Sequence, residues 1–157
     1  MTNRLLNKII TLGAVAGMRS MFAPALLSGA LKNRPSKRIR RSRLHFMQSP
    51  STATIFKVLA AGELIGDKLP MTPNRTEAAG LMGRGLSGAL VGATLAISQR
   101  ESYLVGGGVG ALSAVASTYA FFFLRKKLSQ ETELPDVLWA SLEDMLALKI
   151  GKQAASE

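Results

Sequence analysis

Two carboxylates, Glu63 and Asp67, lie four residues apart within a largely apolar part of the sequence. On a helix this spacing places both side chains on one face, where like charges repel unless a cation or a proton intervenes. The nearest cations in apolar surroundings are Arg19 and Arg84. Ionisable side chains in such surroundings are typical of ion pathways and proton relays. We therefore predict a polar centre made of these four residues.

A purely structural interpretation of the same residues stays open. Glu63 and Asp67 could form a fixed ion-pair network with Arg19 and Arg84. They could also lie at the level of lipid headgroups, because Pro70 indicates that the helix ends just after Asp67. The sequence does not choose between a pathway and a network.

Signatures of catalysis and of metal binding are absent from the sequence. It contains no HExxH motif and no nucleophile elbow, and its glycine-rich residues 106–110 lie in an apolar segment rather than after a strand. It has no cysteine, and its single histidine, His45, has no potential metal ligands spaced nearby. We therefore expect a protein that is not an enzyme, with no metal site and no cofactor.

The apolar residues are distributed as in a membrane protein. They make up 47% of the chain but occur in runs interrupted by Gly, Ala and Ser, and most of the 15 glycines lie within these runs. Only 6% of the residues are aromatic, few for a water-soluble core but suited to membrane helices whose backbones approach closely. The predicted fold is a single all-α domain over residues 1–157, a polytopic membrane helical bundle.

Four apolar segments are expected to form its helices. The first is long enough to cross a bilayer, although Arg19 and Pro24 predict a break within residues 17–24. The second carries four charges and could be re-entrant rather than spanning. The last is the clearest span, because residues 103–124 contain no charge. The predicted helices cover residues 5–31, 51–69, 77–99 and 103–126.

Small residues recur every four positions in the last two apolar segments. Such rows predict close helix contacts, and a short connection at Arg100 and Glu101 predicts that the two helices form a tightly packed antiparallel hairpin. We expect the two rows to serve packing rather than a functional cavity. They comprise Gly88, Gly92 and Ala96 on one helix and Gly106, Gly110, Ala114 and Thr118 on the other.

A basic linker over residues 32–50 accounts for much of the net charge of +10. Beside a membrane segment, such a cluster is more typical of a topology signal or a contact with anionic lipid than of a nucleic-acid site. A second basic cluster follows the last span at residues 125–127. If the second apolar segment spans the bilayer, the two clusters lie on opposite sides of it. If that segment does not cross, both lie in the cytoplasm with the N-terminus outside, which is the arrangement that the positive-inside rule favours. The residues expected to contact lipid or an acidic partner are Arg38, Arg40, Arg41 and Arg43.

The C-terminal tail contains a predicted amphipathic helix over residues 135–150. Large apolar side chains recur there at helical spacing, so the helix is expected to lie along the membrane interface or to dock on the bundle. Glu143 and Asp144 are adjacent and point in different directions, so they are a poor chelating pair. We expect them to be solvated or to contact the basic linker. The apolar residues are Leu138, Leu142, Met145 and Leu146, with Trp139 beside them.

Three motifs together resemble a known family, the small bacterial integral membrane proteins classified as domain of unknown function 4126. The resemblance covers roughly residues 5–148. It implies a multi-pass helical protein of the bacterial inner membrane and supplies no reaction. The motifs are Gly17-Met18-Arg19 with Pro24, Glu63-x-x-x-Asp67-Lys68-x-Pro70 followed by Asn74-Arg75, and Ser141-Leu142-Glu143-Asp144.

Three functions remain open from the sequence. The first is a small transporter or channel component that uses the polar centre. The second is a noncatalytic membrane scaffold whose charges only fix the fold and whose basic linker binds anionic lipid or a protein partner. The third, more distant, is a membrane tether for nucleic acid. A homo-oligomer is expected, because a monomer of this size offers little interior for a pathway and exposed glycine faces favour helix partners.

Overall fold

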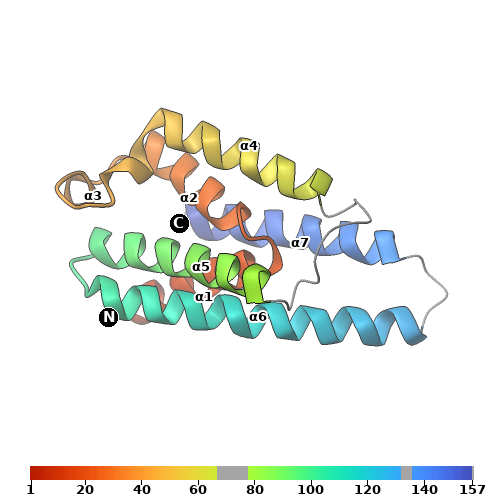
Figure 1. Ribbon diagram of the computed structural model, residues 1–157. Coiled ribbons are helices and arrows are strands. Elements are labelled where there is room, and N and C mark those ends of the chain that lie inside the picture. The colour runs from red at the N-terminus through yellow and green to blue at the C-terminus, as the bar shows by residue number, and fades with distance from the viewer. Residues whose placement is uncertain (67–77, 132–135, 157) are drawn as a thin grey trace.

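The computed structural model describes residues 1–66, 78–131 and 136–156, and the regular secondary structure in these ranges is entirely helical (Figure 1). The predicted all-α fold is confirmed. The elements are α1 (Asn3–Met18), α2 (Phe22–Asn33), α3 (Lys37–Arg40), a 3-10 turn η1 (His45–Gln48), α4 (Pro50–Gly66), α5 (Ala78–Ser98), α6 (Tyr103–Glu131) and α7 (Asp136–Ser156).

The first predicted helix is in fact two helices. The chain leaves α1 at Arg19, whose backbone is extended (φ −140°, ψ 114°), and α2 begins at Phe22. Pro24 lies in the first turn of α2, where its missing N–H would have no helical partner in any case. The break therefore falls within the predicted residues 17–24, but it separates two helices instead of kinking one.

The centre of the fold is a three-helix contact between α1, α5 and α6. Gly88 and Gly92 of α5 lie directly against the backbone of Gly110 and Gly106 of α6, so the predicted antiparallel hairpin is confirmed (Figure 1). Gly13 of α1 also lies against Gly110. The glycine rows thus serve packing within this chain, with α1 as a third partner that the sequence pattern did not indicate.

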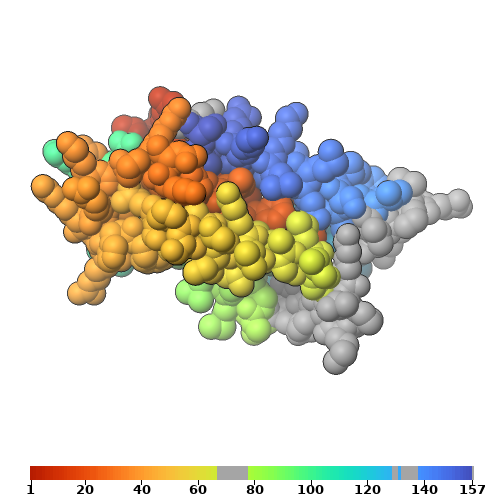
Figure 2. Space-filling model, turned by 90° about the horizontal axis from the view of Figure 1, so that it is seen from above, coloured from red at the N-terminus to blue at the C-terminus, as the bar shows by residue number. Residues whose placement is uncertain are grey.

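The remaining long helices cover this centre. α7 packs against α1 and α2, and α4 packs mainly against α2 as the outermost helix. Viewed from above, α4 runs along the surface beside α2 (Figure 2). Because α4 has few contacts besides those with α2, its attachment depends on that one neighbour.

The two basic clusters lie at opposite ends of the bundle. Arg38 Nη1 donates to the Ser98 carbonyl oxygen at 2.8 Å, which places the basic linker beside the turn between α5 and α6. Arg125 lies near the other end of α6, about 33 Å along the axis from Tyr103 at ~1.5 Å per residue. A membrane crossed by α5 and α6 would separate the clusters. This corresponds to the arrangement predicted for a second apolar segment that spans, and the topology itself stays a prediction.

Two of the described helices have the length and hydropathy needed to cross a bilayer, Ala78–Ser98 and Tyr103–Leu128. Their most apolar windows are 44% and 28% buried within the chain. Much of the apolar surface of both helices therefore faces outward.

Candidate functional site

The break between α1 and α2 brings charged side chains from several helices together. Arg19 and Arg84 are both almost fully buried in the bundle. Side chains from α4, α5, α6 and α7 reach the break or the end of α1. The sequence-predicted polar centre is therefore located at a discontinuity of the backbone.

Arg19 forms a bidentate ion pair with Asp144 of α7. The Arg19 Nε atom lies 2.5 Å from Asp144 Oδ1, and Nη2 lies 3.1 Å from Oδ2. The two side chains are only 3% and 17% exposed. Parallel hydrogen bonds of this kind combine charge attraction with directional specificity. Asp144, which we expected to be solvated or near the basic linker, instead joins the tail helix to the break.

Glu63 of α4 binds the N-terminal end of α2. Its Oε1 accepts hydrogen bonds from the Ser20 N–H at 2.8 Å and the Ser20 hydroxyl at 3.0 Å, and its Oε2 accepts from the Met21 N–H at 2.9 Å. The first N–H groups of a helix lack helical acceptors and form the positive end of its dipole. Glu63 thus binds Met21, the N-cap residue of α2, and Ser20 before it, and the positive end of the α2 dipole stabilises its charge.

Arg84 of α5 binds the C-terminal end of α1. Its Nη1 donates to the Gly17 carbonyl oxygen at 3.1 Å. The Thr118 hydroxyl lies 3.1 Å from the same oxygen and shares its proton with the Ala114 carbonyl oxygen of its own helix at 2.8 Å. The last carbonyls of a helix lack helical donors and form the negative end of its dipole. The two ends of the break are therefore capped by side chains of opposite charge, Arg84 on α1 and Glu63 on α2.

The fourth predicted member of the centre, Asp67, lies outside the described residues, so its pairing stays a prediction. The structure brings Arg19, Glu63 and Arg84 to one break and adds Asp144 to them. The available sequence signal for Asp144 is an acidic pair among the large apolar residues of the tail helix.

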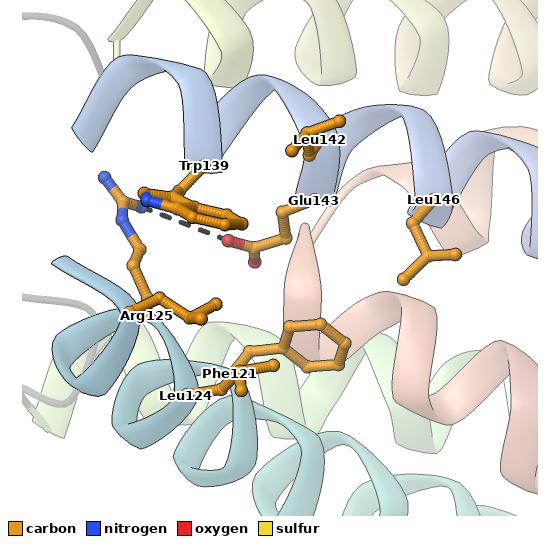
Figure 3. A pocket seen from close by; sticks show the side chains of 8 residues that line it. Phe121, Leu124, Arg125, Trp139, Leu142, Glu143 and Leu146 are labelled. Carbon is orange, nitrogen blue, oxygen red and sulfur yellow. Dashed lines mark ion pairs between the residues drawn. The ribbon is translucent and has the colours of Figure 1, made fainter. Parts of the chain in front are cut away.

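Glu143, the neighbour of Asp144, is also buried, with its side chain 5% exposed. Figure 3 shows it pointing from α7 toward α6, between Trp139 and Phe121. Its Oε2 lies 4.0 Å from Arg125 Nη1, and the pair borders a cavity of about 200 Å³ between the two helices. The expectation that Glu143 is solvated or meets the basic linker is therefore wrong.

The apolar stripe of α7 faces away from the bundle. Leu142 and Met145 are 54% and 68% exposed, whereas Glu143, Ala147 and Gly151 are buried. Gly151 lies against Leu26 and Val15, so small side chains make the contact with α1 and α2. The tail helix does dock on the bundle, but through the face that carries Ala147 and Gly151. The sequence had indicated the opposite face, which carries the large apolar residues.

The basic linker lies on the surface at one end of the bundle. Buried Ile39 holds α3 in place, while the cationic side chains around it are exposed. Within the described ranges no group of three or more His, Asp or Glu side chains is arranged to hold a metal ion. The exposed cations are those predicted to contact lipid, Arg38, Arg40, Arg41 and Arg43.

These features define a class of protein, an all-helical bundle with glycine-packed helices and a charged, doubly capped helix break. The chain matches the family described as domain of unknown function (DUF4126) over residues 6–151 and belongs to that family. No curated protein and no solved structure matches it.

Proposed function

We propose that the chain is a multi-pass integral protein of the bacterial inner membrane that acts as a noncatalytic scaffold. In this proposal the central charges hold the helix break together, and the basic linker contacts anionic lipid. The observation that carries it is that Glu63 and Asp144 each have fixed partners at the break, Glu63 with three donors and Asp144 with two. Carboxylates bound in this way stabilise a fold.

A membrane location is supported by the inverted polarity of the bundle. Large apolar side chains on α4, α6 and α7 point outward, while arginine and glutamate side chains are buried. Such an arrangement is unfavourable in water, where exposed apolar area is costly, and favourable in lipid. The outward-facing side chains include Ile55, Val58, Ile65, Leu104, Leu112, Phe123, Leu142 and Met145.

A small transporter or channel component is the second candidate. The observation that favours it is the broken helix itself, because helix ends within a membrane bundle are a common way to bind substrates and ions. In a transporter, an anion could displace the Glu63 carboxylate from the N-terminal end of α2 and bind there in its place. Alternatively, Glu63 itself would carry a proton. Both uses require water to reach the break.

Water access to the break separates the two candidates. The chain contains no cysteine, so single cysteine substitutions can be labelled with a membrane-impermeant thiol reagent without background. The test position is Gly66, one helical turn after Glu63, where an added Cβ meets nothing within 4 Å. Labelling is measured in intact cells, in inverted vesicles and after denaturation.

Two control positions accompany Gly66→Cys, one expected to stay unlabelled and one expected to be labelled. Gly108 on α6 is exposed and equally open, and it lies within an apolar span, so Gly108→Cys should stay unlabelled in a bilayer. Ser42→Cys in the basic linker should label from one side. The scaffold proposal expects Gly66→Cys to be silent from both sides and reactive only after denaturation. Labelling of Gly66→Cys in the native membrane would contradict the scaffold proposal and support the transport candidate.

A further inference from the structure

Helix α1 runs in the same direction as α6. Gly13 of α1 lies against Gly110 of α6, and Gly17, farther along α1, lies against Ala114, farther along α6. The contacts therefore follow the same order on both helices. α1 ends at the level that α6 has reached near Ala114.

Helix α2 returns toward the end of the bundle at which α1 begins. It starts at the break, where Glu63 binds the backbone N–H of Met21. Its last residue, Asn33, lines a cavity that is also lined by Lys8 of α1 and Ser98 of α5. α1 and α2 thus form a helical hairpin, and its open end lies beside the connection between α5 and α6 (Figure 1).

Neither arm of this hairpin is long enough to cross a bilayer. α1 has 16 residues and α2 has 12, so they extend about 24 Å and about 18 Å at ~1.5 Å per residue. The hydrocarbon core of a bilayer is about 30 Å thick. α5 and α6, in contrast, have the length and hydropathy of membrane spans.

The tip of the hairpin lies at the depth of the middle of α6. Gly17 lies against Ala114, and Leu124, at the end of the uncharged run, is about 15 Å farther along α6 at ~1.5 Å per residue. If α6 crosses the bilayer as proposed above, the tip lies inside the hydrocarbon region. Non-helical backbone is tolerated there only where protein buries it or water reaches it. Glu63 and Arg84 meet this requirement, because they bind the backbone on the two sides of the break.

The open end of the hairpin is also the more basic end of the molecule. The basic linker follows α2 directly, and seven Lys and Arg residues occur within residues 32–43. At the opposite end of the described bundle lies the smaller basic cluster at residues 125–127. The positive-inside rule places the end with the larger excess of Lys and Arg in the cytoplasm.

We propose that α1 and α2 form a re-entrant helical hairpin. It enters the bilayer from the cytoplasmic side, turns at the capped break inside the bilayer and returns to the same side. The inference rests on the membrane location proposed above and adds an orientation to it. It places the start of α1 on the same side as the basic linker, whereas the single helix predicted from the sequence over residues 5–31 would separate the two.

Cysteine accessibility tests the hairpin, because the chain has no cysteine of its own. Asn3→Cys and Asn33→Cys mark its two ends, and both residues are exposed. Both variants should react with a membrane-impermeant thiol reagent in inverted vesicles and not in intact cells. Labelling of the two from opposite sides would overturn the hairpin in favour of a single span. Labelling of both in intact cells would overturn entry from the cytoplasm.

The matched control is the pair Gln99→Cys and Lys127→Cys. Both residues are exposed, Gln99 directly after α5 and Lys127 near the other end of α6. If α6 crosses the bilayer, the two are labelled from opposite sides, with Gln99→Cys on the side of Asn3→Cys and Asn33→Cys. Labelling of the control pair from one side would overturn the membrane location as well, so this failure is distinguishable from failure of the hairpin alone.

A last variant, Met21→Cys, tests the depth of the tip. The substitution keeps the backbone N–H that Glu63 binds. In a re-entrant hairpin, Met21→Cys should stay unlabelled from both sides and react only after denaturation. A hairpin that crosses the bilayer completely would expose its tip at the opposite surface. Labelling of Met21→Cys from the same side and at the same rate as Lys127→Cys would therefore overturn the re-entrant geometry.

Discussion

Helix α1 takes part in two contacts that are built on opposite principles. Along its middle, Gly13 lies against the backbone of α6, and no side chain intervenes. At its end, Arg84 and Thr118 lie against the Gly17 carbonyl oxygen, and Arg19 leads into a break held by carboxylates. The first region depends on the absence of side-chain atoms, and the second depends on the presence of charges. An added atom should therefore disrupt the first, and a removed charge the second.

The largest effect is expected from Gly92→Leu. Its Cβ would collide with the carbonyl oxygen of Gly106 on α6, and a backbone atom cannot move aside as a side chain can. We expect a loss of stability above ~4 kcal/mol, the range of severe core disruption, measured as the midpoint of SDS-induced unfolding.

The matched control for Gly92→Leu is Gly108→Leu on α6. An added Cβ there meets nothing within 4 Å, so its effect should stay within ~0.5 kcal/mol. Equal midpoints for the two variants would show that α5 and α6 do not touch at Gly92.

The next effect in size concerns the pair of Arg19 and Asp144. Arg19→Met alone leaves Asp144 as a largely buried charge without its ion-pair partner, at a cost of ~3–5 kcal/mol. Adding Asp144→Leu should recover much of this loss, because the carboxylate left behind is then removed as well. A double-mutant cycle on SDS unfolding measures the coupling.

The exposed pair of Lys127 and Glu131 is the control for this cycle. Its atoms approach to 3.8 Å, but the side chains are 71% and 61% exposed. Lys127→Ala should therefore change stability by less than ~0.5 kcal/mol. Strictly additive losses in the Arg19 and Asp144 cycle would contradict the buried ion pair.

A smaller effect is expected from Glu63→Gln. The amide keeps one acceptor oxygen but loses the charge that faces the start of α2, at a cost of ~1–3 kcal/mol. Because α4 packs mainly on α2, limited proteolysis within residues 50–66 should become faster. Ser20→Ala, which removes only the hydroxyl bond, should change cleavage less. Unchanged cleavage in Glu63→Gln would mean that the cap does not hold α4.

The smallest effect compares two serines on α6. The Ser117 hydroxyl donates at 2.8 Å to the Ala14 carbonyl on α1, whereas the Ser113 hydroxyl donates to Val109 within α6. Ser117→Ala should cost ~0.6 kcal/mol, as for other hydrogen bonds between membrane helices. Ser113→Ala should be neutral in the same assay. A larger loss of stability for Ser113→Ala than for Ser117→Ala would argue against the contact of α1 with α6.

The sequence was sufficient to predict those features that depend on neighbouring residues. Gly88, Gly92, Gly106 and Gly110 recur at the helical period on segments joined by a few residues, so their pairing required no knowledge of the rest of the fold. The break was located near Pro24 for the same reason, since the ring restricts only its own turn.

Features that join distant parts of the chain were decided by the tertiary structure. Arg19 and Asp144 are separated by 125 positions, and nothing local distinguished Asp144 from Glu63 as the partner of Arg19. The tertiary structure also decided which face of α7 is buried, because small residues such as Ala147 and Gly151, and not its large apolar residues, make the contact with α1 and α2. Local patterns determine a helix and its small-residue rows through contacts within a few turns. Which charge meets which helix end depends on where all the helices lie once packed.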